Sequence, residues 1–516
     1  MEQERLLSRR WYVLLAILAI GGGALFWNLG VRQVVYHQER VLATAGIVLV
    51  GSLGLAIWTF FLSPWTWRVR GRILVGGAFL LAIAGLFVEF RGFSGDLEPV
   101  LGWRFRSGVV QDESRLATPA AKVLKDAAPI WANSPQFLGK ERNATVRGVQ
   151  LARDWYESPP EEVWRKPVGS GWSGFSVAGR RAVTQEQRGD KEAVVCRGAL
   201  DGEVRWVHEV EASFESDIAG DGPRATPTIV GSRVYAAGAT GVLACLELET
   251  GQEIWSVDVV ATNGARIPEW GYSCSPWVSG GQVVVTPGVL SDIGLVAYDA
   301  ATGASRWRGG DDKASYSSPT LHTIAGRRQL LALNANTLSA CDPEDGHVLW
   351  RTDWNFPNPN VCQPMLLAGA RVFVSSGYGA GCALFHVIKN EDESFSVERE
   401  WKTTSLKSKF SSYVHKSGYI YGLDDGMLTC INLASGARVW KAGRYGHGQV
   451  LLVGEQLLVT TEDGGLVLVA AGPEGFKELS RIEVLDGKAW NPPAFAAPLL
   501  FLRNDAEAVC YRLPLI

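Results

Sequence analysis

The amino-acid sequence predicts an all-β protein, an eight-bladed β-propeller with four-stranded blades, preceded by three transmembrane α-helices. Three observations predict this fold. The 516 residues include 58 glycines and 20 tryptophans, which is typical of many tight turns with a repeated aromatic anchor. One short phrase recurs along residues 161–516. The first ninety residues contain three long segments that are almost free of charge.

Residues 1–92 are predicted to form a membrane anchor. Segments 11–29, 41–62 and 73–90 are each long enough to cross a hydrocarbon layer about 30 Å thick as a helix. A cleaved signal peptide would explain only the first of them. We therefore expect three transmembrane helices that hold the protein in a membrane.

Basic residues near the ends of the spans predict the orientation. Those that precede the first span or separate the second from the third are Arg5, Arg9, Arg10, Arg68, Arg70 and Arg72. The loop between the first and second spans has only Arg32 and Arg40. We therefore expect the N-terminus in the cytoplasm and the propeller in the periplasm, held at the inner (cytoplasmic) membrane. Loss of the third span would reverse this placement.

The recurring phrase is an apolar strand, a polar or acidic residue, a glycine turn and a strand that carries tryptophan. Its copies end at Trp206, Trp255, Trp307, Trp350 and Trp440, with a worn copy that ends at Trp401 and a further one at Ile482. Successive tryptophans are 39 to 52 residues apart, which is the period of a four-stranded propeller blade. Glycine permits the tight hairpin because it tolerates positive φ. The tryptophan of the outermost strand is expected to pack on the neighbouring blade.

The number of repeats predicts how the ring closes. Seven full blades end between Trp206 and Ile482, whereas residues 494–513 supply only three strands. A lone outer strand around Trp164 completes the eighth blade, so both chain ends share one sheet. Such an N-to-C clasp removes the open sheet edges. Residues 161–516 are therefore predicted to form the propeller, and residues 93–160 an extracytoplasmic linker that wraps it.

The eight cysteines are predicted to be small buried residues without disulfides. Those at the same position of five different repeats are Cys196, Cys245, Cys341, Cys430 and Cys510. Equivalent positions in successive blades are too far apart to bond. The sequence also has no CxxC or CxxCH motif, which excludes a c-type haem site and the common zinc spacings.

Two sets of loops meet at one mouth of a propeller's central channel, where ligands bind. They are the loops that enter the innermost strands and the loops between second and third strands. In this sequence both sets are rich in polar and aromatic residues. The candidate ligand-binding residues are Trp172, Glu186, Arg188, Arg224, Glu269, Trp270, Tyr316, Gln363, Lys409, Arg444, Tyr445, His447, Trp490, Asn491, Asn504 and Asp505.

This combination suits a flat, anionic ligand. The basic side chains would hold carboxylates, and the tryptophans offer stacking faces. Glu186, Asn504 and Asp505 offer oxygen ligands for calcium. Two alternatives stay open: the same residues serve as turn, capping and rim residues, or they form a peptide or protein site. No catalytic residue and no metal site is assigned.

The phrases ETGQEIW (249–255) and DAATGASRW (299–307) resemble the PQQ-like repeat of quinoprotein propellers. The resemblance covers residues 161–516. It implies the propeller architecture and allows two kinds of function. Quinoprotein alcohol and glucose dehydrogenases with this repeat bind pyrroloquinoline quinone and calcium. The outer-membrane assembly lipoprotein of the β-barrel machinery has the repeat and binds partner proteins.

Two functional hypotheses result. The first is a membrane-anchored extracytoplasmic binding module or scaffold that recognises a ligand or a protein through one face. The second is a membrane quinoprotein oxidoreductase of alcohols or sugars that uses PQQ and calcium. The adjacent cysteine pair of the alcohol enzymes is missing from this sequence. With a net charge of -3 and no patch of interleaved basic and aromatic residues, binding of nucleic acid is not expected.

Overall fold

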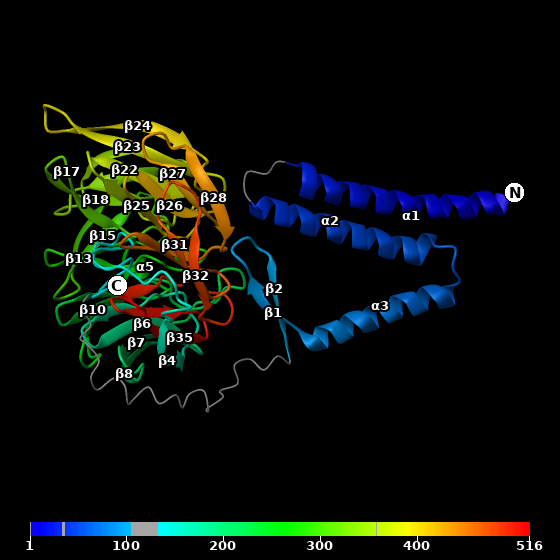
Figure 1. The fold of residues 1–516 in the computed structure, drawn as a ribbon, viewed down its shortest axis with the longest axis horizontal. Helices are drawn as coiled ribbons and strands as arrows, with labels where there is room; N and C mark the ends of the chain where they lie inside the picture. The colour runs from blue at the N-terminus through cyan, green and yellow to red at the C-terminus, as the bar shows by residue number, and fades with distance from the viewer. Residues whose placement is uncertain (1, 33–36, 105–132, 291, 358) are drawn as a thin grey trace. The chain divides into compact units, whose positions relative to one another are not determined.

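The computed structural model describes residues 2–32, 37–104, 133–290, 292–357 and 359–516. The chain divides into two compact units, Met1–Arg115 and Leu116–Ile516, and each is described by itself. Figure 1 shows the helices of the first unit and the strands of the second. Residues 105–132 of the expected linker lie outside the described residues.

The described part of the first unit contains three long apolar helices and a hairpin. The helical segments are α1 (Glu2–Phe26), the π-helical turn η1 (Trp27–Val31), α2 (His37–Ile57), the π-helical turn η2 (Trp58–Leu62) and α3 (Trp67–Phe87). Helical segments Arg10–Val31, His37–Leu62 and Trp67–Phe87 are long and apolar enough to cross a membrane. The hairpin consists of β1 (Val88–Phe93) and β2 (Pro99–Trp103).

The third helix differs from its predicted range of 73–90. It begins at Trp67, after Thr66 in an extended conformation, and ends at Phe87. Its first turn holds Arg70, whose guanidinium donates to backbone carbonyls of the chain between α2 and α3, including Phe60 O at 2.6 Å. Because of these contacts, the helix includes basic residues that composition alone assigns to a loop. Residues 88–90 belong to β1, a strand that the hydropathy pattern did not predict.

The described residues of the second unit form eight sheets, each built on four antiparallel strands. In seven of them the four strands are consecutive along the chain, and in the eighth β4 joins the three C-terminal strands. The first three are β5 (Ser176–Ala178), β6 (Arg181–Arg188), β7 (Lys191–Gly198) and β8 (Val204–Val210); β9 (Thr228–Val230), β10 (Arg233–Ala237), β11 (Val242–Glu247) and β12 (Glu253–Asp258); and β13 (Trp277–Ser279), β14 (Gln282–Val285), β15 (Leu295–Asp299) and β16 (Ser305–Gly309). The short helix α5 (Val259–Thr262) comes directly after β12.

The next four sheets repeat this arrangement. They are β17 (Thr320–Ile324), β18 (Arg327–Leu333), β19 (Thr337–Cys341) and β20 (Val348–Asp353); β21 (Met365–Leu367), β22 (Arg371–Ser376), β23 (Gly381–Lys389) and β24 (Phe395–Thr403); β25 (Tyr413–Lys416), β26 (Tyr419–Asp424), β27 (Met427–Asn432) and β28 (Arg438–Arg444); and β29 (Gln449–Val453), β30 (Gln456–Thr460), β31 (Gly465–Ala470) and β32 (Glu478–Glu483). Within each of these sheets the four strands given are antiparallel to their neighbours, and the eight sheets fit the eight blades expected.

The last sheet is the predicted clasp. The C-terminal strands β33 (Ala494–Ala496), β34 (Leu499–Arg503) and β35 (Glu507–Arg512) are completed by β4 (Glu161–Pro167). In the antiparallel register Cys510 lies opposite Trp164, and Figure 1 shows β4 beside β35. Both chain ends of the propeller therefore lie in one sheet, and the predicted fold class is confirmed.

The glycine and tryptophan of the repeated phrase act together between neighbouring sheets. The Trp206 indole donates to the carbonyl of Leu248 in the next sheet at 2.8 Å, and a Cβ on Gly251 would lie 2.5 Å from the Trp206 ring. The same pairing joins Trp164 to Gly202 across the clasp. In five of these turns glycine is needed both for positive φ and for the approach of the tryptophan from the preceding blade.

Residues 133–152 run along the innermost strands. Ser134 forms a bridge with Val177 of β5, and β3 (Thr145–Val146) pairs in parallel with β29. Arg142 is buried and donates to the carbonyls of Ser275 and Pro276 and to the side chain of Gln363. This segment therefore contacts strands that are distant along the sequence.

All eight cysteines lie in described parts of the chain, and each is buried and unpaired. The prediction of small core residues without disulfides is therefore confirmed. Cys245 and Cys430 illustrate the shared position, since each lies on the third strand of its sheet opposite the tryptophan of the fourth.

Candidate functional site

The predicted site residues lie in loops that enter innermost strands or at the ends of second strands. Because successive strands of each sheet are antiparallel, these positions all face the same end of the propeller. We call this end the mouth. Its side chains form two aromatic groups, a set of buried cations and a carboxylate cluster.

The first aromatic group joins the clasp sheet to its neighbours. The rings of Trp172 and Trp490 lie 4.8 Å apart, and Phe410 lies 5.1 Å from Trp490. The His447 ring is 5.3 Å from Phe410. Glu462 fixes two of these residues, since it accepts from the Trp490 indole at 2.8 Å and from the His447 backbone N–H at 2.9 Å.

The second aromatic group comes from three other sheets. Trp270 stacks on Tyr316 with ring centroids 5.8 Å apart and an interplanar angle of 27°, and it lies 6.3 Å from Tyr378. The Tyr316 hydroxyl accepts from the Trp270 backbone N–H at 3.2 Å. Lys409 connects the two groups, because its Nζ lies 3.4 Å from His447 Nε2 and 5.3 Å from the Tyr378 ring centroid.

Several cations at the mouth are buried. Lys409 is only 1% exposed. Lys488 lies over the rings of Trp490 and Trp172, with Nζ to centroid distances of 4.1 and 4.8 Å, and burial lowers its pKa. Such contacts are favourable because the face of an aromatic ring is electronegative. The mouth therefore combines aromatic faces with positive charge.

Arg224 and Glu192 form a further pair of perturbed groups. Burial lowers the pKa of Arg224 to about 10, although the charge of Glu192 opposes this shift. The Arg224 guanidinium lies over the Phe214 ring at 4.5 Å and donates to backbone carbonyls of Gly220 and Gly222. Burial raises the pKa of Glu192 to about 7, although the Ala239 N–H donates to it at 2.9 Å.

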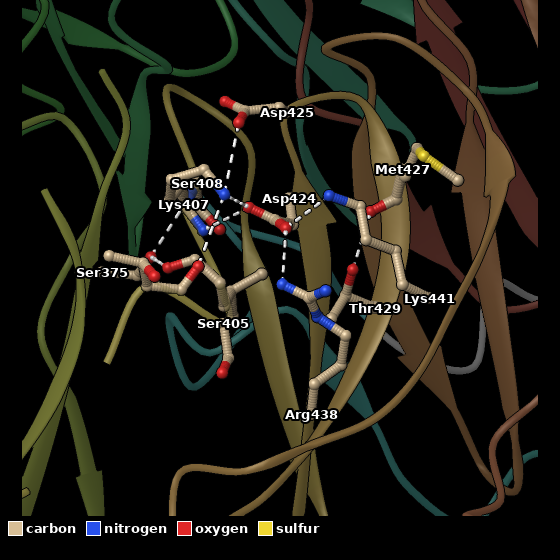
Figure 2. Close-up of polar contacts among 12 residues, drawn as sticks. Ser375, Ser405, Lys407, Ser408, Asp424, Asp425, Met427, Thr429, Arg438 and Lys441 are labelled. Carbon is tan, nitrogen blue, oxygen red and sulfur yellow. Dashed lines mark hydrogen bonds and ion pairs between the residues drawn. The ribbon is translucent and has the colours of Figure 1, made fainter. Parts of the chain in front are cut away.

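A carboxylate cluster lies at the end of β26. Figure 2 shows Asp424 between Lys407, Lys441 and Arg438. Asp424 is fully buried and accepts from the ammonium groups of Lys407 and Lys441 at 2.5 Å each. Asp425 lies 3.3 Å from Lys407 Nζ, and burial raises its pKa. The cluster ties the loop after β24 to the sheet of β25–β28.

The three predicted oxygen ligands do not form a calcium site. Glu186 pairs with Arg188 at 2.6 Å. The Asn504 side-chain oxygen accepts from the backbone N–H groups of Ala506 and Glu507, so it stabilises the turn in which it lies. Among the residues that the structure describes, no three His, Cys, Asp or Glu side chains gather as ligands for a metal ion. The residues present therefore do not fit the calcium that accompanies PQQ.

Several other predicted residues lie outside the two aromatic groups. Gln363 bonds with buried Arg142. Tyr445 donates to Glu478 at 2.7 Å and packs in a hydrophobic cluster with β29–β31. Arg444 donates to the Asp425 backbone carbonyl at 3.4 Å. Glu269 lies exposed next to Trp270.

The remaining two predicted residues lie near the clasp. Asn491 donates to the carbonyls of Gly171 and Ser173 at 3.0 and 2.9 Å. Burial raises the pKa of Asp505, with the charges of Lys488 and Arg503 opposing this shift. Both residues therefore connect the clasp sheet to the loops around it.

Some buried polar atoms at the mouth have no hydrogen-bond partner among the described residues. They are Trp172 Nε1, Glu186 Oε2, Ser408 Oγ, Ser411 Oγ, Asp425 Oδ1 and Asn491 Oδ1. A buried polar atom without a partner costs about 1–3 kcal/mol, so most such atoms in native proteins find one. Six of the thirteen such atoms among the described residues therefore lie in the mouth loops and at the adjoining strand ends.

A separate cavity of about 850 Å³ lies between residues 133–147 and the innermost strands. Its lining includes Leu138, His322, Met365 and Phe495. Burial and the charge of Arg142 lower the pKa of His322 to about 4. The cavity therefore has a neutral imidazole at neutral pH, and its lining also includes the charged side chains of Lys140, Glu141 and Arg147.

Sequence reasoning missed Phe410, Tyr378, Lys488 and the Asp424 cluster. Phe410 comes directly after the predicted Lys409 in the same loop, and Tyr378 lies in a loop between second and third strands, so the loop rule could have found both. Lys488 lies two residues before the predicted Trp490 in the same loop, and Asp424 ends the second strand β26, with Arg438 and Lys441 on β28 of the same sheet as partners. The contact of Lys488 with Trp172 depends on which loops the ring brings together.

Comparisons with known proteins agree with this architecture. Residues 220–442 match the family model described as outer membrane protein assembly factor BamB. No curated protein matches the sequence. Quinohemoprotein alcohol dehydrogenase from Comamonas testosteroni is similar in structure, with 11% identity and a TM-score of 0.53, covering 77% of this chain and 83% of that chain.

BamB from Moraxella catarrhalis is 14% identical over 69% of this chain and 98% of that chain, with a TM-score of 0.49. At these identities structural likeness speaks for the fold alone. The fold defines a β-propeller preceded by three apolar helices. The family match over residues 220–442 supports a PQQ-like repeat in this propeller.

Proposed function

We propose that this protein is a membrane-anchored binding module whose mouth recognises a segment of another protein. The observation that carries the proposal is the meeting of two aromatic groups, buried cations and partnerless polar atoms at one end of the propeller. Aromatic residues and arginine are enriched at protein interfaces, where they supply most of the binding energy.

The partnerless atoms favour a polypeptide over a purely anionic small molecule. Glu186, Asp425 and Asn491 each present an oxygen that accepts hydrogen bonds. A carboxylate ligand would bring more acceptors, whereas an extended peptide brings backbone N–H donors together with carbonyl acceptors. Its own acidic side chains would meet the partly exposed Lys488 and Arg224, and its apolar side chains the tryptophans.

Site-specific photocrosslinking tests the proposal. A benzophenone amino acid is placed at Trp270 in the full-length protein in its native membrane, and a matched variant carries it at Val204, which is exposed on outer strand β8. We expect a discrete protein adduct from position 270 and none from position 204. Equal crosslinking from both positions, or from neither, would contradict recognition at the mouth.

We propose the placement of this module from the distribution of arginines. The cytoplasmic N-terminus and three spans would put the linker (93–160) and the propeller (161–516) in the periplasm, at the inner membrane. Alkaline phosphatase fused after Gly30 or Gly95 should be active, and fused after Trp67 it should be inactive. Activity at Trp67 would overturn this topology.

The alternative function is a PQQ-dependent oxidoreductase, and the structural likeness to an alcohol dehydrogenase is the observation that favours it. If PQQ bound, it would supply two-electron oxidation chemistry. Purified protein incubated with PQQ and calcium should then gain thermal stability and reduce a dye with alcohols or sugars. An unchanged unfolding temperature would remove this alternative, in agreement with the poor fit of Glu186, Asn504 and Asp505 to calcium.

A further inference from the structure

The hairpin β1–β2 has one face made of apolar side chains. In its antiparallel register Val88 lies opposite Trp103, and Phe90 lies opposite Leu101. Because side chains alternate along a strand, these four residues share a face, while the pair Glu89 and Gly102 lies on the other. The sequence of the hairpin is therefore amphipathic with a period of two.

This apolar face is exposed in the first unit. Phe90 is 53% exposed, Leu101 62% and Trp103 54%. A lone two-stranded hairpin is at best marginally stable in water and needs a surface to cover its apolar face. Exposed apolar patches of this kind mark contacts with a partner or a membrane.

The hairpin continues directly from the third candidate span. Helix α3 ends at Phe87 and β1 begins at Val88. The Phe87 and Trp103 rings lie 5.5 Å apart, and the Arg104 backbone N–H donates to the Phe87 carbonyl at 2.7 Å. Both strands are thus held at the end of the helix. If that helix crosses a bilayer, the hairpin must start at its surface.

A contact with the first residue of α2 places the hairpin further. His37 Nε2 lies 3.4 Å from the carboxylate of Glu98, the residue just after the hairpin turn. The hairpin therefore lies at the end of the helices where α1 ends and α2 begins. Aromatic residues at such ends favour the boundary between headgroups and acyl chains, because their rings are apolar and polarisable at once.

We propose that the face formed by Val88, Phe90, Leu101 and Trp103 lies in the headgroup layer of the same bilayer that the three helices cross. The occupant of this face is lipid, in the manner of an interfacial amphipathic segment. The inference goes beyond the proposed function, since it assigns lipid contact to residues outside the spans. The hairpin would fix the level at which the chain leaves the membrane.

Spin labelling of the full-length protein in nanodiscs of phosphatidylcholine and phosphatidylglycerol tests this. Nitroxides are placed by Leu101→Cys and Phe90→Cys on the apolar face and by Glu89→Cys on the opposite face. The unsubstituted protein supplies the background, because its eight cysteines are buried. Collision with oxygen, which partitions into lipid, is compared with collision with a water-soluble nickel chelate.

We expect the oxygen-to-nickel ratio at Leu101→Cys and Phe90→Cys to exceed that at Glu89→Cys. Two references calibrate the scale: Leu81→Cys within α3 and Val204→Cys on β8. Free access of nickel to the apolar face overturns the inference, and so does protection from both reagents, which would indicate the propeller or a second copy. Nickel access at Leu81→Cys as well would instead overturn the membrane anchor itself.

Discussion

Replacement of Trp164 by alanine tests how much the clasp contributes to the propeller. Trp164 is buried between Phe175 and Phe501, its indole donates to the Ala199 carbonyl at 3.0 Å, and Gly202 packs on its ring. A buried tryptophan truncated to alanine costs about 3–5 kcal/mol. The carbonyl left without a donor adds about 1 kcal/mol. We therefore expect a loss of at least about 4 kcal/mol.

This loss of unfolding free energy corresponds to a decrease in melting temperature. Unfolding entropy is about 2.1 cal/mol/K per residue, so a propeller of about 350 residues has about 0.7 kcal/mol/K. Trp164→Ala should then lower Tm by about 6 °C in calorimetry of the full-length protein in detergent. Trp164→Phe, which mainly loses the indole N–H, should lower it by about 1–2 °C.

The control is Tyr156→Ala, because Tyr156 is 93% exposed just before β4. It should leave Tm unchanged. If Trp164→Ala unfolds within about 1 °C of the wild type, the energy of ring closure does not depend on this contact. The other seven sheets would then be stable without the contribution of the clasp.

Three further predictions concern buried charges. Because the pKa of Glu192 rises from 4.5 to about 7 in the folded protein, about 3 kcal/mol of stability should be lost as pH rises across this window, and Glu192→Gln should abolish that loss in a pH series of Tm. Asp424→Ala leaves buried Lys407 without its main counter-charge, so it should lower the free energy of unfolding by about 3–5 kcal/mol. The control Glu249→Ala, at an exposed ion pair, should lower it by under about 1 kcal/mol. Equal effects of the two variants in urea unfolding would refute the role of the cluster. Arg142→Ala removes the bonds that hold residues 133–147 on the innermost strands, so limited proteolysis should cut that segment first; unchanged resistance would show that these bonds do not retain it.

Local sequence was sufficient for the blades. The glycine turn and its tryptophan are a few residues apart, and the pair recurs in five copies. The structure adds that the glycine of one blade meets the tryptophan of the preceding one, as Gly251 meets Trp206. The period of the sequence repeat was therefore enough to predict the contact between neighbouring blades.

Hydropathy predicted the apolar helices but not the hairpin after the third one. That helix begins at Trp67 because Arg70 caps carbonyls of the preceding chain, a contact that an average over residues cannot detect. The sequence prediction divided residues 88–103 between the end of the last span and the linker. The period-two pattern of the hairpin covers only a few residues, too short a stretch to be distinguished from irregular chain.

The mouth was predicted only in part. The loop rule identified Trp172, Trp270, Lys409 and His447, which lie in the two aromatic groups or connect them. It also assigned Gln363 and Tyr445 to the mouth, although the first bonds with Arg142 and the second with Glu478. Position in a loop places a backbone, whereas the direction of a side chain depends on neighbours from other blades.

The sequence by itself determined the repeat, the number of sheets, the closure of the ring and the apolar helices, because each depends on periodicity or composition along the chain. Only the tertiary structure decided which charges are buried together. Lys488 lies over Trp172 because the ring brings separate loops into contact, and Lys407 meets Asp424 because the loop that enters β25 packs against the end of β26. Burial then raises the pKa of Glu192 and Asp425, since a low-polarity environment disfavours their charged forms.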